Sequence, residues 1–167
     1  MSTPLQPHWQ VRPATLADLP AVHQQMQQLA DFEGYLTDFR VTEIDLKTLG
    51  FGREPQFDLL VASHDGNLGG YAVLVYQRFS YDLTPVATLK ELFVAPAYRN
   101  TGAGQALFQA VMKTASDYGA CRMDWLVLSD NLRAQRFYQQ QGGHPSSQWI
   151  RYEIGLLSTS SNDCNNN

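Results

Sequence analysis

The residues of this chain that could do chemistry gather where an apolar run ends and turns into a helix. Glu91 to Val94 reads as the end of a strand, Pro96 breaks it, and the pattern Arg-x-x-Gly-x-Gly follows at residues 99–104. Two glycines let a ligand approach the backbone closely, and the first amides of the next helix have no acceptor within that helix. Together with Arg99 and the positive end of the helix dipole, these donors predict a binding site for a diphosphate.

Spacing separates the motifs that could bind a diphosphate. A P-loop requires a glycine, four residues and then Gly-Lys-Ser/Thr, a run that the chain does not contain. A dinucleotide-binding fingerprint requires a third glycine, whereas Gly104 is followed by Gln105, Ala106 and Leu107. Neither motif accounts for these residues.

The segment closely resembles the acetyl-CoA motif of the GNAT superfamily of N-acetyltransferases, in which Arg/Gln-x-x-Gly-x-Gly/Ala follows a strand. A second segment strengthens the resemblance, since residues 124–142 read as an apolar strand, then Asn-x-x-Ala, then Phe137-Tyr138 and a glycine. The resemblance implies that Tyr138 protonates the departing thiolate. It also implies that acetyl-CoA is bound by Leu92, Phe93, Val94, Arg99, Asn100, Thr101, Gly102, Ala103, Gly104, Gln105, Asn131 and Ala134.

Within this superfamily the chain is most similar to the spermidine/spermine (diamine) and thialysine N-acetyltransferase branch. Smaller signatures of that branch recur in order, at residues 29–33, 50–55, 60–62, 81–82 and 149. The resemblance covers residues 9–157 and implies a homodimer in which each subunit helps to wall the partner's amine site. It places the substrate-binding residues at Phe32, Glu33, Asp82, Lys90, Asp124, Trp125 and Trp149.

One position departs from this branch. Its polyamine enzymes carry adjacent acids at the positions that match Lys90 and Glu91, and the first acid helps to bind and deprotonate the amine; here the first is a lysine. Successive strand residues point to opposite faces. Glu91 can therefore take the catalytic role of the missing first acid only if a bulge re-aims its side chain. Because Lys90 would repel a polyamine, a smaller amine is favoured over spermine: a diamine, an aminoglycoside-like amine or an amino acid with a side-chain amine.

The reaction implied is direct attack of the amine on the thioester, because the motifs contain no serine or cysteine that could carry a covalent intermediate. In the family, backbone N–H groups near Leu92 to Val94 stabilise the oxyanion. Two alternatives stay open. The chain could acetylate a protein or peptide, with an open groove at residues 29–38, or it could be a non-catalytic acyl-CoA-binding sensor, which Lys90 favours and Tyr138 disfavours.

Composition agrees with one compact enzyme domain. The 167 residues are 44% hydrophobic and 17% charged, as in an ordinary globular chain. The net charge of −4 argues against a nucleic-acid surface and weakly favours cationic substrates. No signal peptide or membrane span is recognisable, so we expect a cytoplasmic location. Cys121 and Cys164 are too few for a metal site, and no metal is expected.

The order of hydrophobic periods predicts an α/β (α+β) fold. Strands are expected at residues 8–13, 57–63, 69–78, 86–94, 123–128 and 149–157, and helices after Thr15-x-x-Asp18, after Thr42, at 106–118 and at 131–141. The resemblance adds a mixed, mostly antiparallel sheet, flanked by helices and splayed where CoA enters. We expect a single GNAT domain at 8–157, a flexible N-terminus at 1–7 and a disordered tail at 158–167.

Overall fold

The computed structural model describes residues 8–146, 148 and 150–155. The chain divides into two compact units, of which the first ends at Leu128 and the second begins at Ser129. The expected flexible N-terminus, the expected disordered tail and Trp149 lie outside the described residues.

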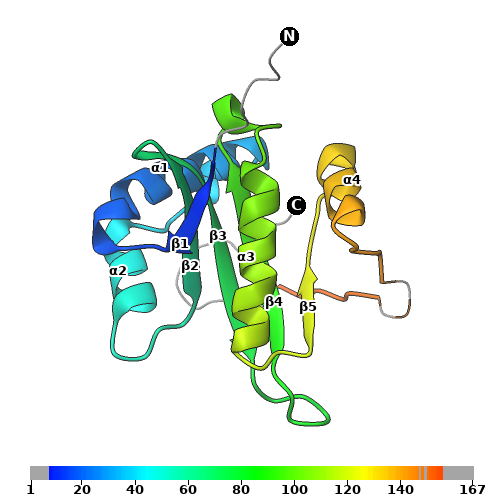
Figure 1. Ribbon diagram of the computed structural model, residues 1–167. Coiled ribbons are helices and arrows are strands. Elements are labelled where there is room, and N and C mark those ends of the chain that lie inside the picture. The colour runs from blue at the N-terminus through cyan, green and yellow to red at the C-terminus, as the bar shows by residue number, and fades with distance from the viewer. Residues whose placement is uncertain (1–7, 147, 149, 156–167) are drawn as a thin grey trace. The chain divides into compact units, whose positions relative to one another are not determined.

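The first unit is built on a five-stranded sheet with the order β1-β2-β3-β4-β5 (Figure 1). The strands are β1 (Gln10–Pro13), β2 (Asp58–His64), β3 (Asn67–Gln77), β4 (Val86–Val94) and β5 (Arg122–Trp125). All neighbours are antiparallel except β4 and β5, which are parallel. The expected mixed, mostly antiparallel sheet is therefore confirmed. The fifth strand is shorter than expected, because its pairing with β4 ends at Leu89 and Trp125.

Helices cover both faces of this sheet. On one face α1 (Leu19–Phe32) and α2 (Glu43–Phe51) pack on alternate strand residues, among them Tyr71, Val73 and Phe93. On the other face lies α3 (Ala103–Asp117), which runs along the strands in front of the sheet in Figure 1 and buries Leu107 and Phe108 completely. Each such buried side chain contributes about 2 kcal/mol of hydrophobic free energy, so both layers hold the sheet in place.

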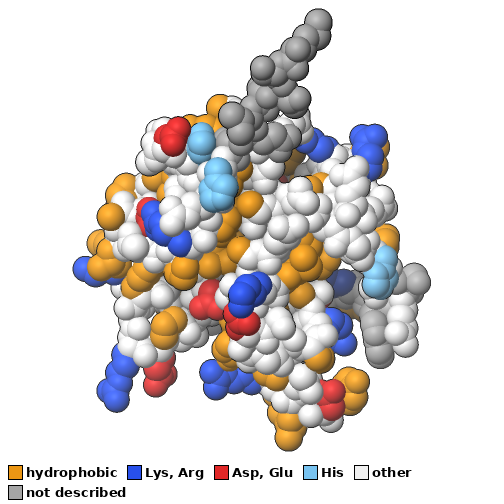
Figure 2. Space-filling view, in the orientation of Figure 1, with side chains coloured by type: hydrophobic (Ala, Val, Ile, Leu, Met, Phe, Trp, Pro, Cys, Tyr) orange, Lys and Arg blue, Asp and Glu red, His pale blue; other side chains and the backbone are white. Residues whose placement is uncertain are grey.

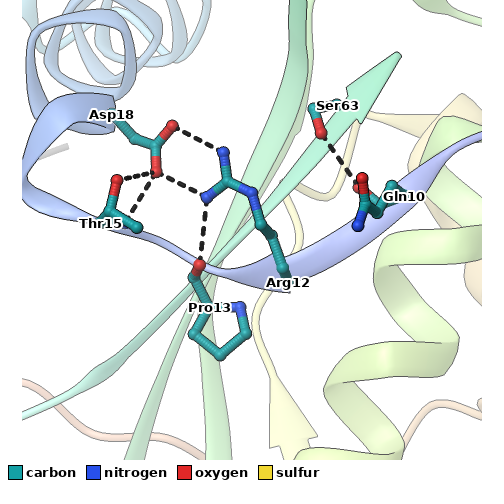
Figure 3. Close-up of polar contacts among 6 residues, drawn as sticks. All are labelled: Gln10, Arg12, Pro13, Thr15, Asp18 and Ser63. Carbon is teal, nitrogen blue, oxygen red and sulfur yellow. Dashed lines mark hydrogen bonds and ion pairs between the residues drawn. The ribbon is translucent and has the colours of Figure 1, made fainter. Parts of the chain in front are cut away.

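Threonine and aspartate side chains bond the backbone at the start of α2 and in the short turn before α1. Thr42 and Asp45 form a reciprocal capping box at α2, in which each backbone N–H is bonded by the other's side chain. Near α1, the Asp18 carboxylate accepts bonds from the backbone N–H and hydroxyl of Thr15 at 2.7 and 2.8 Å (Figure 3). Arg12 on β1 donates twice to the same carboxylate, at 2.7 and 3.0 Å. These bonds tie β1 to the short 3-10 turn η1 (Leu16–Asp18) that leads into α1.

The second unit contains α4 (Leu132–Gln140), which begins at the Asn131 cap. The strand expected at 149–157 is wrong over residues 150–155, which form neither helix nor strand. Along this segment the apolar residues Ile150, Tyr152 and Ile154 alternate with other residues, but they are 78%, 88% and 85% exposed. Among the described residues no strand pairs with them, so the alternation alone does not fold this segment.

Candidate functional site

The diphosphate motif lies between β4 and α3, as the sequence predicts. The chain leaves β4 at Val94, passes through the 3-10 turn η3 (Pro96–Tyr98) and enters α3 at Ala103. Asn100 and Gly102 have φ angles of +64° and +89°, so the loop turns sharply and only a residue without Cβ is comfortable at position 102. Among the described residues no side chain caps α3, which leaves the first-turn amides of Ala103, Gly104 and Gln105 directed out of the helix end.

Side chains far apart in the sequence hold this loop in shape. The indole N–H of Trp9 donates to both the carbonyl and the hydroxyl oxygen of Thr101, each at 3.1 Å. The Thr101 hydroxyl donates in turn to the Tyr98 carbonyl at 2.6 Å, and the Tyr98 ring meets the Trp9 ring edge-on. Arg99 donates through Nε to the Val94 carbonyl at 3.1 Å. We call this loop, residues 99–105, the cradle. Trp9, a residue that the motif does not contain, helps to hold the cradle in shape.

The pairing between β4 and β5 ends before β4 reaches the cradle. β5 pairs with β4 only from Val86 to Leu89, so residues 90–94 of β4 continue beyond the register of β5. On its other side β4 stays paired with β3 as far as Gly70 and Val94. This is the splay expected of the sheet. Within the described residues it leaves one edge of β4 without a paired strand at Leu92 to Val94, where the resemblance places the oxyanion donors.

A β-bulge lies in β4 at the position of the two candidate acids. Val73 pairs with Glu91 and its neighbour Leu74 pairs with Leu89, so Lys90 is an extra residue on β4. Val73 and Leu74 face opposite sides of the sheet, and their partners Glu91 and Leu89 therefore also face opposite sides. The bulge turns Glu91 toward the α1 and α2 face while the Lys90 side chain is exposed. The condition that sequence reasoning set for Glu91 is thus met.

Glu91 lies among groups that act on its charge. Burial raises the pKa of its carboxyl, whereas the hydroxyl of Tyr71, which donates to Oε2 at 2.8 Å, and the Lys90 ammonium lower it. Glu33, just after α1, has a pKa raised by partial burial and by the charge of Glu91. Burial, followed by the charges of Glu91 and Glu33, raises the pKa of Tyr35 to about 12. Two carboxylates and two tyrosine hydroxyls therefore share one electrostatic environment.

A cavity of about 330 Å³ opens beside Glu91. Its lining is mostly apolar, and Glu91 supplies a carboxylate to it from the sheet. The other lining residues come from α1, the α1–α2 connection, α2, β3 and the segment before β2: Met26, Arg40, Val41, Asp45, Leu46, Leu49, Phe57 and Val73. Arg40 is already bonded to the Thr37 carbonyl in the α1–α2 connection, and Asp45 is bonded to Thr42 at the start of α2. An aliphatic chain with a cationic end would suit these walls.

The remaining candidates of the first unit lie apart from this cavity's lining. Asp82 accepts bonds from the Ser80 hydroxyl and the Thr84 N–H, which lower the pKa of its carboxyl, so it stabilises its own turn. Asp124 accepts from the Thr88 hydroxyl at 2.7 Å across the β4–β5 pair. Trp125 packs edge-on against Phe108 of α3. Phe32, at the end of α1, is 57% exposed.

In the second unit, the matched asparagine has a structural role that is visible. The Asn131 side-chain oxygen accepts from the Ala134 N–H at 3.1 Å and caps α4. Tyr138 is half-buried on α4, with its ring edge-on to that of Phe137 at 5.3 Å. Trp149 lies outside the described residues.

Sequence reasoning missed Tyr71, Tyr35 and Trp9. The signal for Tyr71 was its place in an apolar strand, because a buried tyrosine hydroxyl needs a hydrogen-bond partner and Glu91 on the neighbouring strand is one. Trp9 bonds a loop 92 positions away, and no local pattern could reveal that contact.

In the described part of the chain, no three His, Cys, Asp or Glu side chains lie close enough to hold a metal ion. No helix of that part has the length and apolar character needed to cross a membrane. On the face seen in Figure 2, Lys and Arg side chains are scattered among acidic and apolar ones rather than gathered into a patch.

Known proteins are similar to this chain in sequence and in fold. Residues 23–143 match the model of the Acetyltransferase (GNAT) family. An uncharacterized N-acetyltransferase of Mycobacterium tuberculosis is 42% identical over 90 residues, which are 53% of this chain and 54% of that protein. The match thus spans about half the length of this relative. The thialysine N-epsilon-acetyltransferase of Bos taurus is 30% identical over 79% of this chain and 82% of its own.

A solved structure shows the same architecture. An aminoglycoside N-acetyltransferase in complex with CoA superposes with a TM-score of 0.71 at 20% identity, over 93% of this chain and all of the other. The splayed sheet, the uncapped helix after Arg-x-x-Gly-x-Gly and the family match lead to one assignment. The chain belongs to the Acetyltransferase (GNAT) family.

Proposed function

We propose that the chain transfers the acetyl group of acetyl-CoA directly to the primary amine of a small cationic substrate. The observation that carries this proposal is the bulge at Lys90, beside which the Glu91 carboxylate lines a largely apolar cavity. Glu91 belongs to β4, the strand that leads into the diphosphate cradle. The carboxylate offers a counter-charge for an ammonium group and an acceptor for its proton.

The residues at the start of α3 fit the diphosphate of CoA. Ala103 is fully buried, Gly102 turns in the left-handed region, and no side chain in the described part of the chain caps the helix. In this proposal the amides of residues 102–105 and the Arg99 guanidinium hold the phosphate oxygens. Acetyl-CoA supplies an activated acyl group as a thioester, and the solved relative in complex with CoA has the same fold.

Glu91 would accept the proton that the ammonium must lose before it attacks. A base works best when its pKa lies near the working pH, and burial moves the Glu91 pKa upward in that direction. As the C–N bond forms, the C–S bond breaks and the leaving thiolate takes a proton, a role that the family resemblance gives to Tyr138. The bared backbone edge of β4 at Leu92 to Val94 would donate to the oxyanion.

The cavity favours a substrate with a short aliphatic chain. Its walls are apolar along α1, α2 and β3, with Glu91 on the sheet side and the charges of Arg40 and Asp45 also on the lining. Such walls suit a diamine or an amino acid with a side-chain amine, and the bovine relative is named for thialysine. Glu33 would add attraction for a cation, since it shares the field of Glu91. Phe32, Asp82, Asp124, Trp125 and Trp149 remain proposed contacts from the resemblance.

The wider setting of the enzyme is also proposed. The family resemblance supports a homodimer, and acetyl-CoA as co-substrate supports a cytoplasmic location.

A thiol-release assay tests the function. Acetyl-CoA is mixed with the purified chain and with single amines: spermidine, a diamine, lysine, ornithine, thialysine, an aminoglycoside and a basic peptide. We expect one small amine to accelerate CoA release and to yield a singly acetylated product by mass spectrometry. Acceleration only by the peptide would contradict a small substrate, and silence with bound acetyl-CoA would favour a non-catalytic sensor.

A further inference from the structure

We infer that Tyr71 is a positioning residue for Glu91: its buried hydroxyl fixes the carboxylate in the cavity and keeps it ready to accept a proton. This inference rests on the proposed function for its kinetic consequence. Its structural part, the hold of Tyr71 on Glu91, can be tested without any turnover.

The geometry of the sheet brings the two side chains together. Tyr71 pairs with Phe93, and Val73, two residues later on the same face of β3, pairs with Glu91. Tyr71 is therefore the diagonal neighbour of Glu91, within reach of a long side chain. Its hydroxyl donates to Oε2 at 2.8 Å. Glu91 lies on the same face of the sheet as its partner Val73, the face that α1 and α2 cover.

Tyr71 has little freedom to do anything else. The residue is 0% exposed, and its ring packs against Phe93 with centroids 6.0 Å apart. Burial, helped by the charge of Glu91, raises the pKa of the Tyr71 hydroxyl far above its usual range, so the oxygen keeps its proton and remains a donor. The bond thus has a fixed direction, from Tyr71 to Glu91.

A donor is needed because the carboxylate lies largely out of water. Burial favours the neutral acid, which cannot accept a proton from an amine, and the bond from Tyr71 favours the ionised form. Lys90 also favours it, but its side chain is exposed, so its charge is screened. The other titratable or charged groups that face this region are Glu33, Tyr35, Arg40 and Asp45. In addition to these groups, Tyr71 holds the Glu91 carboxylate by a direct hydrogen bond.

The test removes one oxygen atom. Tyr71→Phe keeps the ring against Phe93 and deletes the bond to Glu91. The matched control is Tyr76→Phe on the same strand, which deletes a similar 2.9 Å bond from a tyrosine to Asp58. Each protein is titrated by carbon NMR of its carboxyl groups, with Glu91 assigned by comparison with Glu91→Gln, and thermal melting checks the fold.

We expect Tyr71→Phe to raise the pKa of Glu91 by about one unit or more, because a hydrogen bond to a charged group is lost. The acidic limb of kcat/KM against pH should move to higher pH by a similar amount. Tyr76→Phe should change neither, and Tyr71→Phe should change the profile no further in the Glu91→Gln background.

Three results would overturn the inference. An unchanged Glu91 pKa in Tyr71→Phe would show that the bond does not control the carboxylate. A shifted pKa with an unchanged kinetic limb would make Tyr71 structural only, while the proposed function stands. Full activity of Glu91→Gln would remove Glu91, and Tyr71 with it, from the mechanism.

Discussion

At the scale of single residues, one carboxylate distinguishes this chain from a generic fold. The Glu91 carboxylate accepts a hydrogen bond from Tyr71, and burial raises its pKa. The charge of Glu91 also acts on the nearby Glu33. The sign of its pH dependence follows: a base with a raised pKa is active above that pKa and loses activity as pH falls through it. We therefore expect activity to fail in mildly acidic solution, at a higher pH than for an ordinary glutamate.

Tyr138 tests the other end of the reaction. Tyr138→Phe should reduce turnover by roughly 10 to 10,000-fold, the range of general acid catalysis, because the leaving thiolate would lose its proton donor. Calorimetric binding of CoA should be unchanged, since the cradle amides belong to another helix. Unchanged turnover would remove Tyr138 from the mechanism.

Residues with motif positions could be assigned from the sequence, but the side chains around them could not. The spacing of Arg99, Gly102 and Gly104 fixes where the helix must begin. The bulge at Lys90 depends on pairing between β3 and β4, and a one-residue shift in that register decides which side chain enters the cavity. For this reason the role of Glu91 could be stated only as a condition.

At the scale of elements, the two ends of α3 provide a matched pair of glycines. Gly102 before the helix and Gly119 after it have φ angles of +89° and +91°. Alanine at either position should destabilise the fold by about 1 kcal/mol, because a side chain is strained in that region. Only Gly102→Ala should weaken CoA binding measured by calorimetry. Equal affinity in both variants would mean that the diphosphate lies elsewhere.

The link between β1 and α1 predicts a pH-dependent stability. Arg12 lowers the pKa of Asp18 to about 2, so the bond stabilises the fold above about pH 4 and is lost as pH falls toward about pH 2. Discounted for partial solvent exposure, Asp18→Asn should lower the free energy of unfolding by about 1 kcal/mol at neutral pH.

The check is urea denaturation of Asp18→Asn against the parent chain at about pH 7 and again between about pH 4 and pH 2, where the deficit should shrink. Asp117→Asn is the control, because its pair with Lys113 is 64% and 75% exposed and should be worth less than about 0.5 kcal/mol. A deficit that does not change with pH would show that the charge of Asp18 is not its source.

Elements were recognisable from sequence where local chemistry defined them. The helix after Thr42 and the strand at 86–94 lie where the patterns indicate. Residues 150–155 failed because alternation describes a strand only when a neighbour supplies hydrogen bonds. For the same reason β5 is shorter than the sequence predicts, because its pairing with β4 stops where the sheet splays.

At the scale of the whole molecule, assembly is the property that remains to be measured. The proposed homodimer should have a mass of about twice the 18.8 kDa of the chain. Light scattering after size-exclusion chromatography measures this mass directly. A monomer over the concentrations used for turnover would mean that the amine site is complete within one chain.

The central claim is that a bulge brings Glu91 to the amine that receives the acetyl group. Its most direct test is kcat/KM of Glu91→Gln with the preferred amine, beside CoA affinity measured by calorimetry. We predict a loss of roughly 100 to 10,000-fold in kcat/KM, as expected for removal of a general base, with CoA affinity unchanged. Parent-like kcat/KM across the pH range would contradict the account.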